Sequence, residues 1–597
     1  MCAAVVVAFT AIRTWVAAAG WFYWDDLILH GRAAAHSLPD PGFLLADHDG
    51  HLMPGGMALA WIAAHAAPLD FRVPLIQIAA LQLLAGAALA RMLWVLLRGR
   101  PVLLLPLVAA LAIPLGLPAA TWWAAAINAL PLTAAMAWAV ASMVRLAETG
   151  QRRHAVGAAL ATAVGLLFVE KALLVPVVAA AALLGRWWVD GGGQASLRML
   201  WHRTRVAWAA QAAVVIAWAV VFVVVVGRLG GRGSFGEAEG TQPGFLHLVD
   251  HTYRRAVLPT LGGGPWRWDR WHPGPPMADP SVPAVLVGVL ACVLVLAWSL
   301  STRRRTGPVW LAVALYPLVS VILVAVARAG PDSAAEIVQT LRYHSEMPVV
   351  LAAAAALALA APRRVSADGP DAGPPRPPPT SPPPPRPGLV AVGVAALAAL
   401  LASSTVSTLT YRQTWSEQPS RDYALPLLAA LRDREAPLLD QDLPLEVLHP
   451  VTAPAHRLSS LLEGVPGVPD VGEWTTEPVV IDALGTLHPA EVVAGRMVPP
   501  GPEPGCGHRV GPEGTSIELD GPLLERDWVV QLNVFADTRG EVGVRLDGDE
   551  TTAPVAAGLG TVFVRVEGGG TAISVTPVRG VTDLCLGAGP VGVLLPR

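Results

Sequence analysis

Long apolar stretches separated by short polar turns run through the first two thirds of the chain. A helix needs roughly 20 mostly apolar residues to cross the hydrocarbon core of a bilayer. The pattern therefore predicts a polytopic α-helical membrane protein with about eleven spanning helices. These helices are expected near residues 2–20, 73–97, 102–118, 131–147, 154–169, 172–188, 207–227, 283–300, 309–327, 347–361 and 388–409.

The apolar stretch 55–67 is short for a span, and we interpret it as a helix that lies in the membrane interface. Arginine placement supports this interpretation, because cytoplasmic loops are enriched in Lys and Arg. If 55–67 crossed the bilayer, every later basic cluster would move to the outer face. With the N-terminus in the cytoplasm, the short inner loops instead carry Arg98 and Arg100, Arg152 and Arg153, Arg198, Arg203 and Arg205, Arg303 to Arg305, and Arg363 and Arg364.

This orientation predicts a multi-pass protein of the plasma membrane, with residues 1–410 forming the transmembrane domain. The outer face then holds a first loop, 21–72, and a long loop, 228–282. The Pro-rich segment 362–387 becomes a cytoplasmic linker. The first apolar stretch is similar to a signal peptide, but we expect a retained helix. Otherwise the acidic pair that follows it would sit on a free, mobile N-terminus.

The pattern changes after about residue 410, where the chain is predicted to lie outside the cytoplasm. Residues 411–505 mix helical periodicity with turn signals and are expected to form a mixed α/β segment. From residue 515, short alternating runs separated by Gly and Asp are typical of a β-sandwich or jelly roll. Cys506 and Cys585 flank these strands within a domain at 506–597. We expect a disulfide there if the domain faces an oxidising compartment, and two unlinked thiols are the alternative.

The overall composition agrees with a membrane protein. Hydrophobic residues make up 53% of the 597 and charged residues only 15%, and the mean hydropathy is +0.50. A soluble protein of this length is rarely so apolar. The formal net charge of -3 gives no sign of nucleic-acid binding.

An acidic pair follows the first predicted span almost at once, in the stretch WFYWDDLILHGR at 21–32. A carboxylate beside a bilayer is costly unless it is used. Asp25 and Asp26 are therefore candidates for a general base or for holding a cation, and the alternative is a pair that caps a short helix. Because neighbouring side chains on a helix point about 100° apart, we expect only one to face a cavity, and we favour Asp25.

Two histidines lie three residues apart in DHDGHLMPGG, residues 47–56. With Asp26, His48 and His51 are weak candidates for a metal site, but ligands crowded around a Gly-containing turn have poor geometry. We therefore predict no metal site and no certain cofactor, while a divalent cation stays open. Substrate contact by His48 and His51 and a loop that fixes the return to the membrane are the other interpretations.

Three further candidates lie at predicted outer ends of spans. Asn128 follows two interfacial tryptophans and is a candidate ligand contact. Glu170 lies beside Lys171, the chain's single lysine, and the two form either a local ion pair that eases insertion or a contact with a sugar or phosphate. Neither motif is specific by itself.

The stretch TLRYHSEMP places Arg342, Tyr343 and His344 just before a span. Arginine binds phosphate in a bidentate manner, and an outer arginine runs against the positive-inside trend. We favour a phosphate contact, with snorkelling to lipid headgroups as the alternative. The loop 228–282 adds weaker candidates for sugar stacking and phosphate contact, which are Trp266, Trp268, Trp271, Arg254 and Arg255.

The chain resembles the GT-C superfamily of polyprenyl-phosphate-sugar-dependent glycosyltransferases in its layout, which is the first span, the WDD pair, the short interfacial helix and the later EK and RY elements, in this order. The most specific stretches are the HLMP-like and EKALL-like runs. The resemblance covers about 1–410 by layout. The predicted sandwich is similar to the carbohydrate-binding-type domains of actinobacterial cell-wall arabinosyl- and mannosyltransferases. A second outer acidic motif, present in some GT-C members, is not recognisable, so metal dependence and acceptor class stay open.

The resemblance implies a sugar transfer at the outer face from a polyprenyl-phosphate donor to a cell-envelope glycan or lipid. It also implies inversion at the anomeric carbon, with Asp25 or Asp26 as base. Two alternatives stay open: a lipid or polysaccharide transporter, and a non-catalytic assembly protein with a sugar-binding outer domain. Ionisable groups at span ends, rather than along a path through the membrane, favour the transferase.

Overall fold

A computed structural model describes residues 1–227, 244–327, 335–364 and 387–597 of the chain. The chain divides into two compact units. The first, which we call the helical unit, contains Met1–Leu29 and His36–Gln418, and the second, the β unit, contains His30–Ala35 and Pro419–Arg597. Most of the predicted Pro-rich linker, the first part of the loop 228–282 and residues 328–334 lie outside the described residues.

The helical unit holds eight helices that are long and apolar enough to cross a membrane within the described residues. Two shorter apolar helices, Cys2–Ala17 and Pro101–Ala112, and the 15-residue α8 accompany them. Each of the predicted spans coincides with one of these helices, so the prediction of a polytopic membrane fold is confirmed. The expected count of about eleven is not, because only eight of the described helices are long and apolar enough to span. The helices are α1 (Cys2–Ala17), α5 (Arg72–Leu96), α6 (Leu104–Ala112), α7 (Trp123–Thr149), α8 (Arg152–Leu166), α9 (Leu174–Val189), α10 (Gln194–Val226), α13 (Val282–Thr302), α14 (Gly307–Ala327), α15 (Met347–Ala360) and α16 (Pro387–Trp415).

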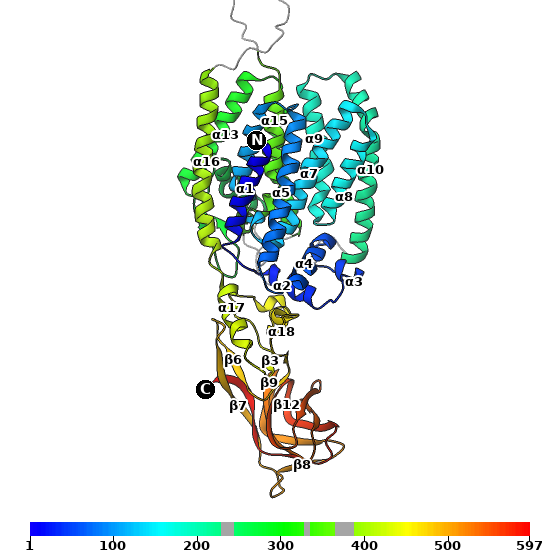
Figure 1. The fold of residues 1–597 in the computed structure, drawn as a ribbon, viewed down its shortest axis with the longest axis vertical. Coiled ribbons are helices and arrows are strands. Elements are labelled where there is room, and N and C mark those ends of the chain that lie inside the picture. Colours follow the sequence, from blue (N-terminus) through cyan, green and yellow to red (C-terminus); the bar gives the residue numbers. More distant parts are fainter. Residues whose placement is uncertain (228–243, 328–334, 365–386) are drawn as a thin grey trace, which may run out of the picture. The chain divides into compact units, whose positions relative to one another are not determined.

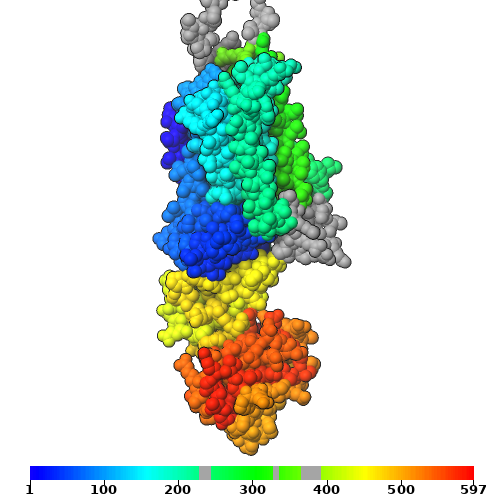
Figure 2. Space-filling model, turned by 90° about the vertical axis from the view of Figure 1, so that its right-hand side faces the viewer, coloured from blue at the N-terminus to red at the C-terminus, as the bar shows by residue number. Residues whose placement is uncertain are grey.

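Helix α7 is the centre of this unit, and α10 lies at its surface. The most apolar window of α7 is 78% buried, whereas that of α10 is 11% buried. Helix α7 is rich in alanine, and small side chains let neighbouring helices approach closely. Helix α10 instead presents exposed Ile216 and Val224 and forms much of the face seen in Figure 2. Its apolar surface suits contact with lipid.

Three short helices follow α1: α2 (Asp25–Ala34), α3 (Pro41–Leu44) and α4 (Pro54–Ala66). Helix α4 has 13 residues, which at about 1.5 Å per residue is too short to cross a bilayer. It coincides with the predicted interfacial stretch 55–67 and contacts α5 and α7. In Figure 1 it lies across one end of the spanning helices. We call this end, where α7 begins, the α2 end.

The β unit is built on one antiparallel sheet that curls around an aliphatic core. Its long strands β9 (Thr515–Ala536) and β12 (Gly558–Arg579) pair along most of their length. The core contains Val530, Leu532 and Val564. The strand order is β11 (Thr551–Val555), β10 (Gly540–Arg545), β12, β9, β14 (Gly589–Pro596), β7 (Leu487–Val498) and β6 (Val479–Ile481), with β5 (Trp474–Thr475), β8 (His508–Val510) and β13 (Leu584–Leu586) attached beside it.

The predicted mainly-β domain is confirmed, but the strand limits differ from the expected short runs. Residues 515–536 and 558–579, where short runs were expected, are each one continuous strand. Gly568 and Gly570 of β12 have positive φ and lie at register shifts inside the β9–β12 pairing. A bulge accommodates glycine in that conformation without ending the ladder.

The first part of the β unit is tied to the sheet by charged side chains. It contains α17 (Pro419–Leu431), α18 (Leu458–Leu462) and the parallel strands β3 (Leu438–Leu439) and β4 (Val471–Gly472). Arg565 of β12 pairs with Glu473 at 2.5 Å and with Asp527 at 3.3 Å. Asp527 also accepts from Arg457 at 3.1 Å. This network joins the predicted mixed α/β segment to the strands that follow it.

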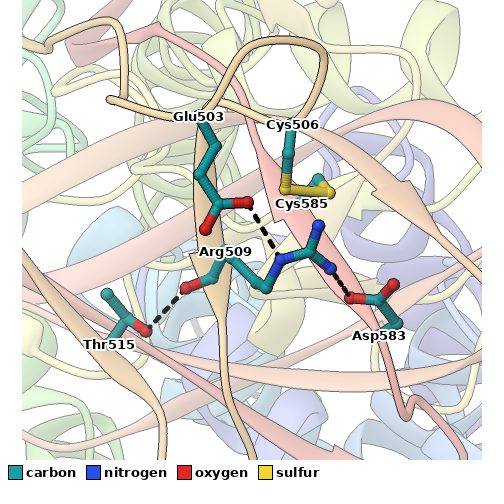
Figure 3. Close-up of a disulfide and its surroundings, with 6 residues drawn as sticks. All are labelled: Glu503, Cys506, Arg509, Thr515, Asp583 and Cys585. Carbon is teal, nitrogen blue, oxygen red and sulfur yellow. Dashed lines mark hydrogen bonds and ion pairs between the residues drawn. A yellow bond between two sulfur atoms is a disulfide. The ribbon is translucent and has the colours of Figure 1, made fainter.

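The expected disulfide is present between Cys506 and Cys585, with the two Cα atoms 4.9 Å apart (Figure 3). Cys506 precedes β8 and Cys585 lies in β13, and these two strands are paired. Arg509 lies beside the bridge and contacts Glu503 at 3.0 Å and Asp583 at 2.5 Å. The bridge closes 79 residues and links the segment before β8 to β13.

Candidate functional site

Asp26 is completely buried and holds two backbone segments together. One carboxylate oxygen accepts from the N–H of Ala124 at 2.7 Å, and the other from that of Tyr23 at 2.9 Å. Ala124 is in the first turn of α7, where backbone N–H groups lack partners within the helix. Burial raises the pKa of Asp26 well above its ordinary value, against the lowering effect of the two N–H groups. Asp26 therefore caps α7 from outside the helix.

Asp25 differs from its neighbour although both lie in the first turn of α2. It is half-buried, and among the described residues no hydrogen bond or ion pair engages its carboxylate. The two side chains thus diverge as the helical geometry predicts. Of the acidic pair, Asp25 is the one whose carboxylate is available to a ligand.

Tyr23 is the point around which charged groups gather. Its buried ring meets Trp122 edge-on at 5.1 Å, and the guanidinium of Arg270 lies 5.2 Å from the ring centre. Its hydroxyl donates to the carbonyl of Pro273. Burial raises the pKa of Tyr23, nearby Arg270 and Arg342 lower it, and nearby Asp25 and Asp26 raise it. One phenol is therefore within electrostatic reach of two carboxylates and two arginines.

The guanidinium of Arg342 lies over two aromatic rings. Its guanidinium carbon lies 4.8 Å from the ring centre of Trp122 and 5.0 Å from that of Tyr343, and Nη2 donates to the Tyr343 hydroxyl at 3.1 Å. Such cation–π contacts orient a guanidinium while leaving much of its edge for hydrogen bonding. Because Trp122 also contacts Tyr23, ring contacts connect Arg342 to the segment that carries the acidic pair.

Lys171 is paired with a residue that the sequence did not single out. Its Nζ contacts Glu346 at 2.7 Å and donates to the carbonyl of Tyr343. Glu346 is completely buried and also accepts from Tyr316 at 2.9 Å. Of the two alternatives for Glu170 and Lys171, the ion pair between these neighbours is not observed. The ε-ammonium instead fastens the turn after α8 to the segment that carries Arg342.

Glu170 faces His51, with Nδ1 at 2.9 and 3.0 Å from its two carboxylate oxygens. His51 belongs to a tight turn in which the backbones of His48 and His51 exchange hydrogen bonds. Asp49 and Gly50 occupy the turn with positive φ, as Asp-Gly does in type I′ turns. His48 is buried. His48 and His51 thus lie three residues apart because they flank this turn, so their spacing has a structural explanation.

No group of three or more potential metal ligands gathers within the described residues. The loop 47–56 instead approaches the Glu170 turn, since Gly55 N–H donates to Leu167 at 2.8 Å and a Cβ at Gly55 would collide with Phe168. Asn128 faces this loop: a Cβ at Gly56 would lie 3.6 Å from its Oδ1. That buried Oδ1 has no hydrogen-bond partner among the described residues.

The tryptophans of the loop 228–282 have structural partners. Trp266 donates to the hydroxyl of Ser403 at 2.8 Å and Trp268 to the carbonyl of Ser407 at 2.9 Å, which fastens the loop to α16. Trp271 is 59% exposed. Arg254 is in an exposed ion pair with Asp250, and it lies with Arg255 in a π-helix. Trp271 is therefore the most exposed of the three, and sugar stacking stays a prediction.

Sequence reasoning missed Tyr23, Arg270 and Glu346. A signal was present for Glu346, because an acidic residue at the start of an apolar span requires a partner. Its partner is 175 positions away in the sequence, by the difference of 346 and 171, and the spacing alone does not reveal such a pair. His344, a predicted contact, is buried, and its Nε2 has no hydrogen-bond partner among the described residues.

The fold and this cluster define a polytopic membrane protein that gathers acidic, basic and aromatic side chains at the α2 end of its helices. No family model and no curated protein matches the chain. Its fold is similar to those of solved structures. Arabinofuranosyltransferase AftD from mycobacteria is 12% identical with a TM-score of 0.40, over 99% of this chain and 58% of that chain.

Arabinosyltransferase EmbB from Mycobacterium smegmatis is 13% identical with a TM-score of 0.31, over 100% of this chain and 64% of that chain. ArnT from Cupriavidus metallidurans, solved bound to undecaprenyl phosphate, is 15% identical with a TM-score of 0.29, over 78% of this chain and 88% of that chain. The present chain thus spans less than two thirds of the two mycobacterial proteins.

Proposed function

We propose that the chain is a membrane glycosyltransferase that moves a sugar from a polyprenyl-phosphate donor to a cell-envelope glycan or lipid. One observation carries the proposal. Asp25 lies two residues after Tyr23, and the guanidinium of Arg270 lies 5.2 Å from the Tyr23 ring centre. The guanidinium of Arg342 lies 4.8 Å from the ring centre of Trp122, which contacts Tyr23. The donor class comes from the sequence resemblance to GT-C enzymes, in which an acidic pair of this kind follows the first span.

The chemistry assigns a role to each side of the cluster. The Asp25 carboxylate accepts the proton of an acceptor hydroxyl while that oxygen forms a bond to the anomeric carbon of the donor sugar. The bond between this carbon and the phosphate oxygen breaks, and its electron pair leaves with the polyprenyl phosphate. Attack opposite the leaving group inverts the anomeric centre. Arg342 and Lys171 stabilise the negative charge that grows on the phosphate.

The same contacts give Asp26 and Glu346 positioning roles. Asp26 uses both carboxylate oxygens on backbone N–H groups, which fixes the start of α2 against α7 and so aims Asp25. Glu346 holds Lys171 beside the Tyr343 carbonyl, and Arg342 precedes Tyr343 directly. The buried ion pair therefore anchors the segment that carries Arg342, and we expect this to preform the phosphate site.

The predicted orientation places the α2 end on the outer face, where lipid-linked sugars rather than nucleotide sugars are available. The disulfide of the β unit supports this orientation, because disulfides persist mainly in oxidising compartments. Cysteine labelling of intact cells tests it. A reagent that cannot cross membranes is expected to label a Cys at Gly50 but not one at Gly150, and the opposite result excludes this orientation.

The catalytic assignment is tested by comparing Asp25→Asn with Asp26→Asn in membranes supplied with radiolabelled polyprenyl-phosphate sugars. Loss of a general base slows a reaction by about 10²- to 10⁴-fold, so we expect Asp25→Asn to abolish transfer at an unchanged amount of folded protein. Asp26→Asn should lower the amount or thermal stability of the protein more than its activity per molecule. Full transfer by both variants would exclude the proposed base.

A further inference from the structure

A cluster of basic side chains lies where helices α5, α7 and α8 pack together, near the end of the helical unit opposite the α2 end. Its centre is Arg91 of α5, whose guanidinium carbon lies 4.0 Å from the ring centre of Trp138 on α7. Trp138 is 41% exposed, so the stacked pair lies at the surface of the unit. We propose that this cluster binds the phosphodiester of an anionic glycerophospholipid from the surrounding bilayer. The site is separate from the proposed transfer site and does not depend on it.

The depth of Arg91 in the membrane supplies the first argument. It lies five residues before Leu96, the last residue of α5, which is about 8 Å along the helix axis. Helix α7 has 27 residues and is therefore about 40 Å long, whereas the hydrocarbon core of a bilayer is about 30 Å thick. Arg91 is thus expected just inside the edge of the hydrocarbon core. A cation at this depth is costly unless an anion meets it.

Arg91 has no carboxylate partner among the described residues. Its Nη1 donates to the carbonyl of Trp138 at 3.2 Å, and its Nη2 donates to the hydroxyl of Ser142 at 3.4 Å. A guanidinium has five N–H donors, so most of them remain for a ligand after these two contacts. The ring of Trp138 orients one face of the guanidinium, and the edge of this group matches two oxygens of a phosphate.

Two further basic side chains flank this contact. Arg145 follows Ser142 by three residues on α7, and His154 precedes Gly157 by three residues on α8, so each lies on the same helix face as its neighbour. These two faces approach closely, because a Cβ at Gly157 would lie 3.3 Å from the Ser142 hydroxyl. The Nε2 of His154 is buried and has no hydrogen-bond partner among the described residues. A phosphate oxygen would give this nitrogen an acceptor when it carries a proton.

The charge of the cluster favours an anionic head group over a zwitterionic one. Glu148 lies 3.4 Å from Arg145 but 3.0 Å from Arg186, so one carboxylate is shared between two arginines. Arg152 and Arg153 begin α8 and add positive charge. Phosphatidylcholine would bring a quaternary ammonium group into this field, whereas phosphatidylglycerol brings none. Basic clusters between membrane helices bind anionic head groups for the same reason.

The test is calorimetric titration of dioctanoyl-phosphatidylglycerol into the purified full-length protein in a non-ionic detergent. We expect saturable binding that Arg91→Gln weakens by about tenfold or more, as expected for loss of a charged hydrogen bond. Arg304→Gln is the matched control, because this exposed arginine lies in the turn after α13, next to the residue that follows α15. It removes one positive charge from the same end of the unit and should leave binding unchanged.

Two further variants keep the test decisive if Arg91→Gln does not fold. The Arg145 side chain is 45% exposed, so Arg145→Gln should fold normally and weaken binding by a smaller factor. Trp138→Phe keeps an aromatic ring under Arg91 and should bind more tightly than Trp138→Leu, whereas a merely apolar contact would make these two variants equal.

Three results would overturn the proposal. Equal binding of dioctanoyl-phosphatidylcholine would show that the head-group charge is not read. Equal losses in Arg91→Gln and Arg304→Gln would show general attraction to a basic surface rather than a site. Displacement of the lipid by an equal concentration of inorganic phosphate would identify a free-phosphate site. Asp25→Asn should bind the lipid as the wild type does, so the outcome is separate from that of the transfer proposal.

Discussion

The helical unit and the β unit treat buried polar groups in opposite ways. In the helical unit, several side chains leave a buried polar atom without a partner among the described residues. They include Asn128, Gln82, His344 and Glu346. In residues 419–597, which the structure describes throughout, one such atom occurs, Nδ1 of His456. Unsatisfied buried atoms cost free energy, and they are retained where a ligand can satisfy them. The difference agrees with the proposal that a ligand binds in the helical unit rather than in residues 419–597.

The largest effect that sharpens this comparison is expected at the Lys171–Glu346 pair. Glu346→Leu leaves the Lys171 ammonium without its carboxylate, and breaking a buried ion pair from one side costs about 3–5 kcal/mol. We expect a large fall in thermal stability in detergent together with loss of transfer. The double variant Glu346→Leu with Lys171→Met should recover stability but not transfer. Recovery of both by the double variant would show that Lys171 is not needed for the chemistry.

Removal of the disulfide is expected to have a comparable effect on stability, confined to the β unit. Removal of a bridge that closes 79 residues costs about 2–5 kcal/mol. Cys506→Ser with Cys585→Ser should make the β unit more sensitive to protease while leaving the helical unit intact. Limited proteolysis followed by mass spectrometry measures this difference. Equal loss of resistance in both units would contradict the separation of roles.

A smaller, pH-dependent effect is expected at Asp26. Burial raises the pKa of Asp26 in the folded protein above its unfolded value, which is near 4. The folded state therefore holds this proton more tightly, and stability is lost as pH rises from about 4 through the raised pKa. The unfolding temperature of the wild type minus that of Asp26→Asn should fall across this range. A difference that rises with pH would show that the two N–H groups outweigh burial.

The smallest effect is expected at the surface of the β unit. Arg509 contacts Glu503 and Asp583 in solvent, where ion pairs contribute little because water screens them. Arg509→Ala should leave the unfolding temperature unchanged, and its neighbouring disulfide should still form. A marked loss of stability would mean that the ion pairs of Arg509, rather than the disulfide, hold β8 and β13 together.

Sequence periodicity predicted the helices because an apolar run of the required length has one stable form in a bilayer. It predicted the sheet because alternation with period two indicates strands, and the disulfide because two cysteines flank these strands in a region expected to face an oxidising compartment. It did not predict the length of the strands, because glycines such as Gly568 fit both a turn and a bulge and only pairing with β9 decides between them.

The site was harder to predict because its partners are distant in sequence. Asp25, Arg342 and Lys171 were recognisable as ionisable groups at span ends. Pairing of Lys171 with Glu346, rather than with adjacent Glu170, depends on how the turn after α8 meets the start of α15. The stacking of Arg342 on Trp122 depends likewise on packing between helices. No local pattern encodes either contact.

The most direct test of the proposed function is a structure of the full-length protein with a polyprenyl-phosphonate sugar analogue that cannot be cleaved. The account predicts the phosphonate within hydrogen-bond distance of Arg342 and Lys171, and the anomeric carbon facing Asp25 with room for an acceptor hydroxyl between them. A phosphonate bound away from both cations, or an anomeric carbon turned away from Asp25, would contradict it.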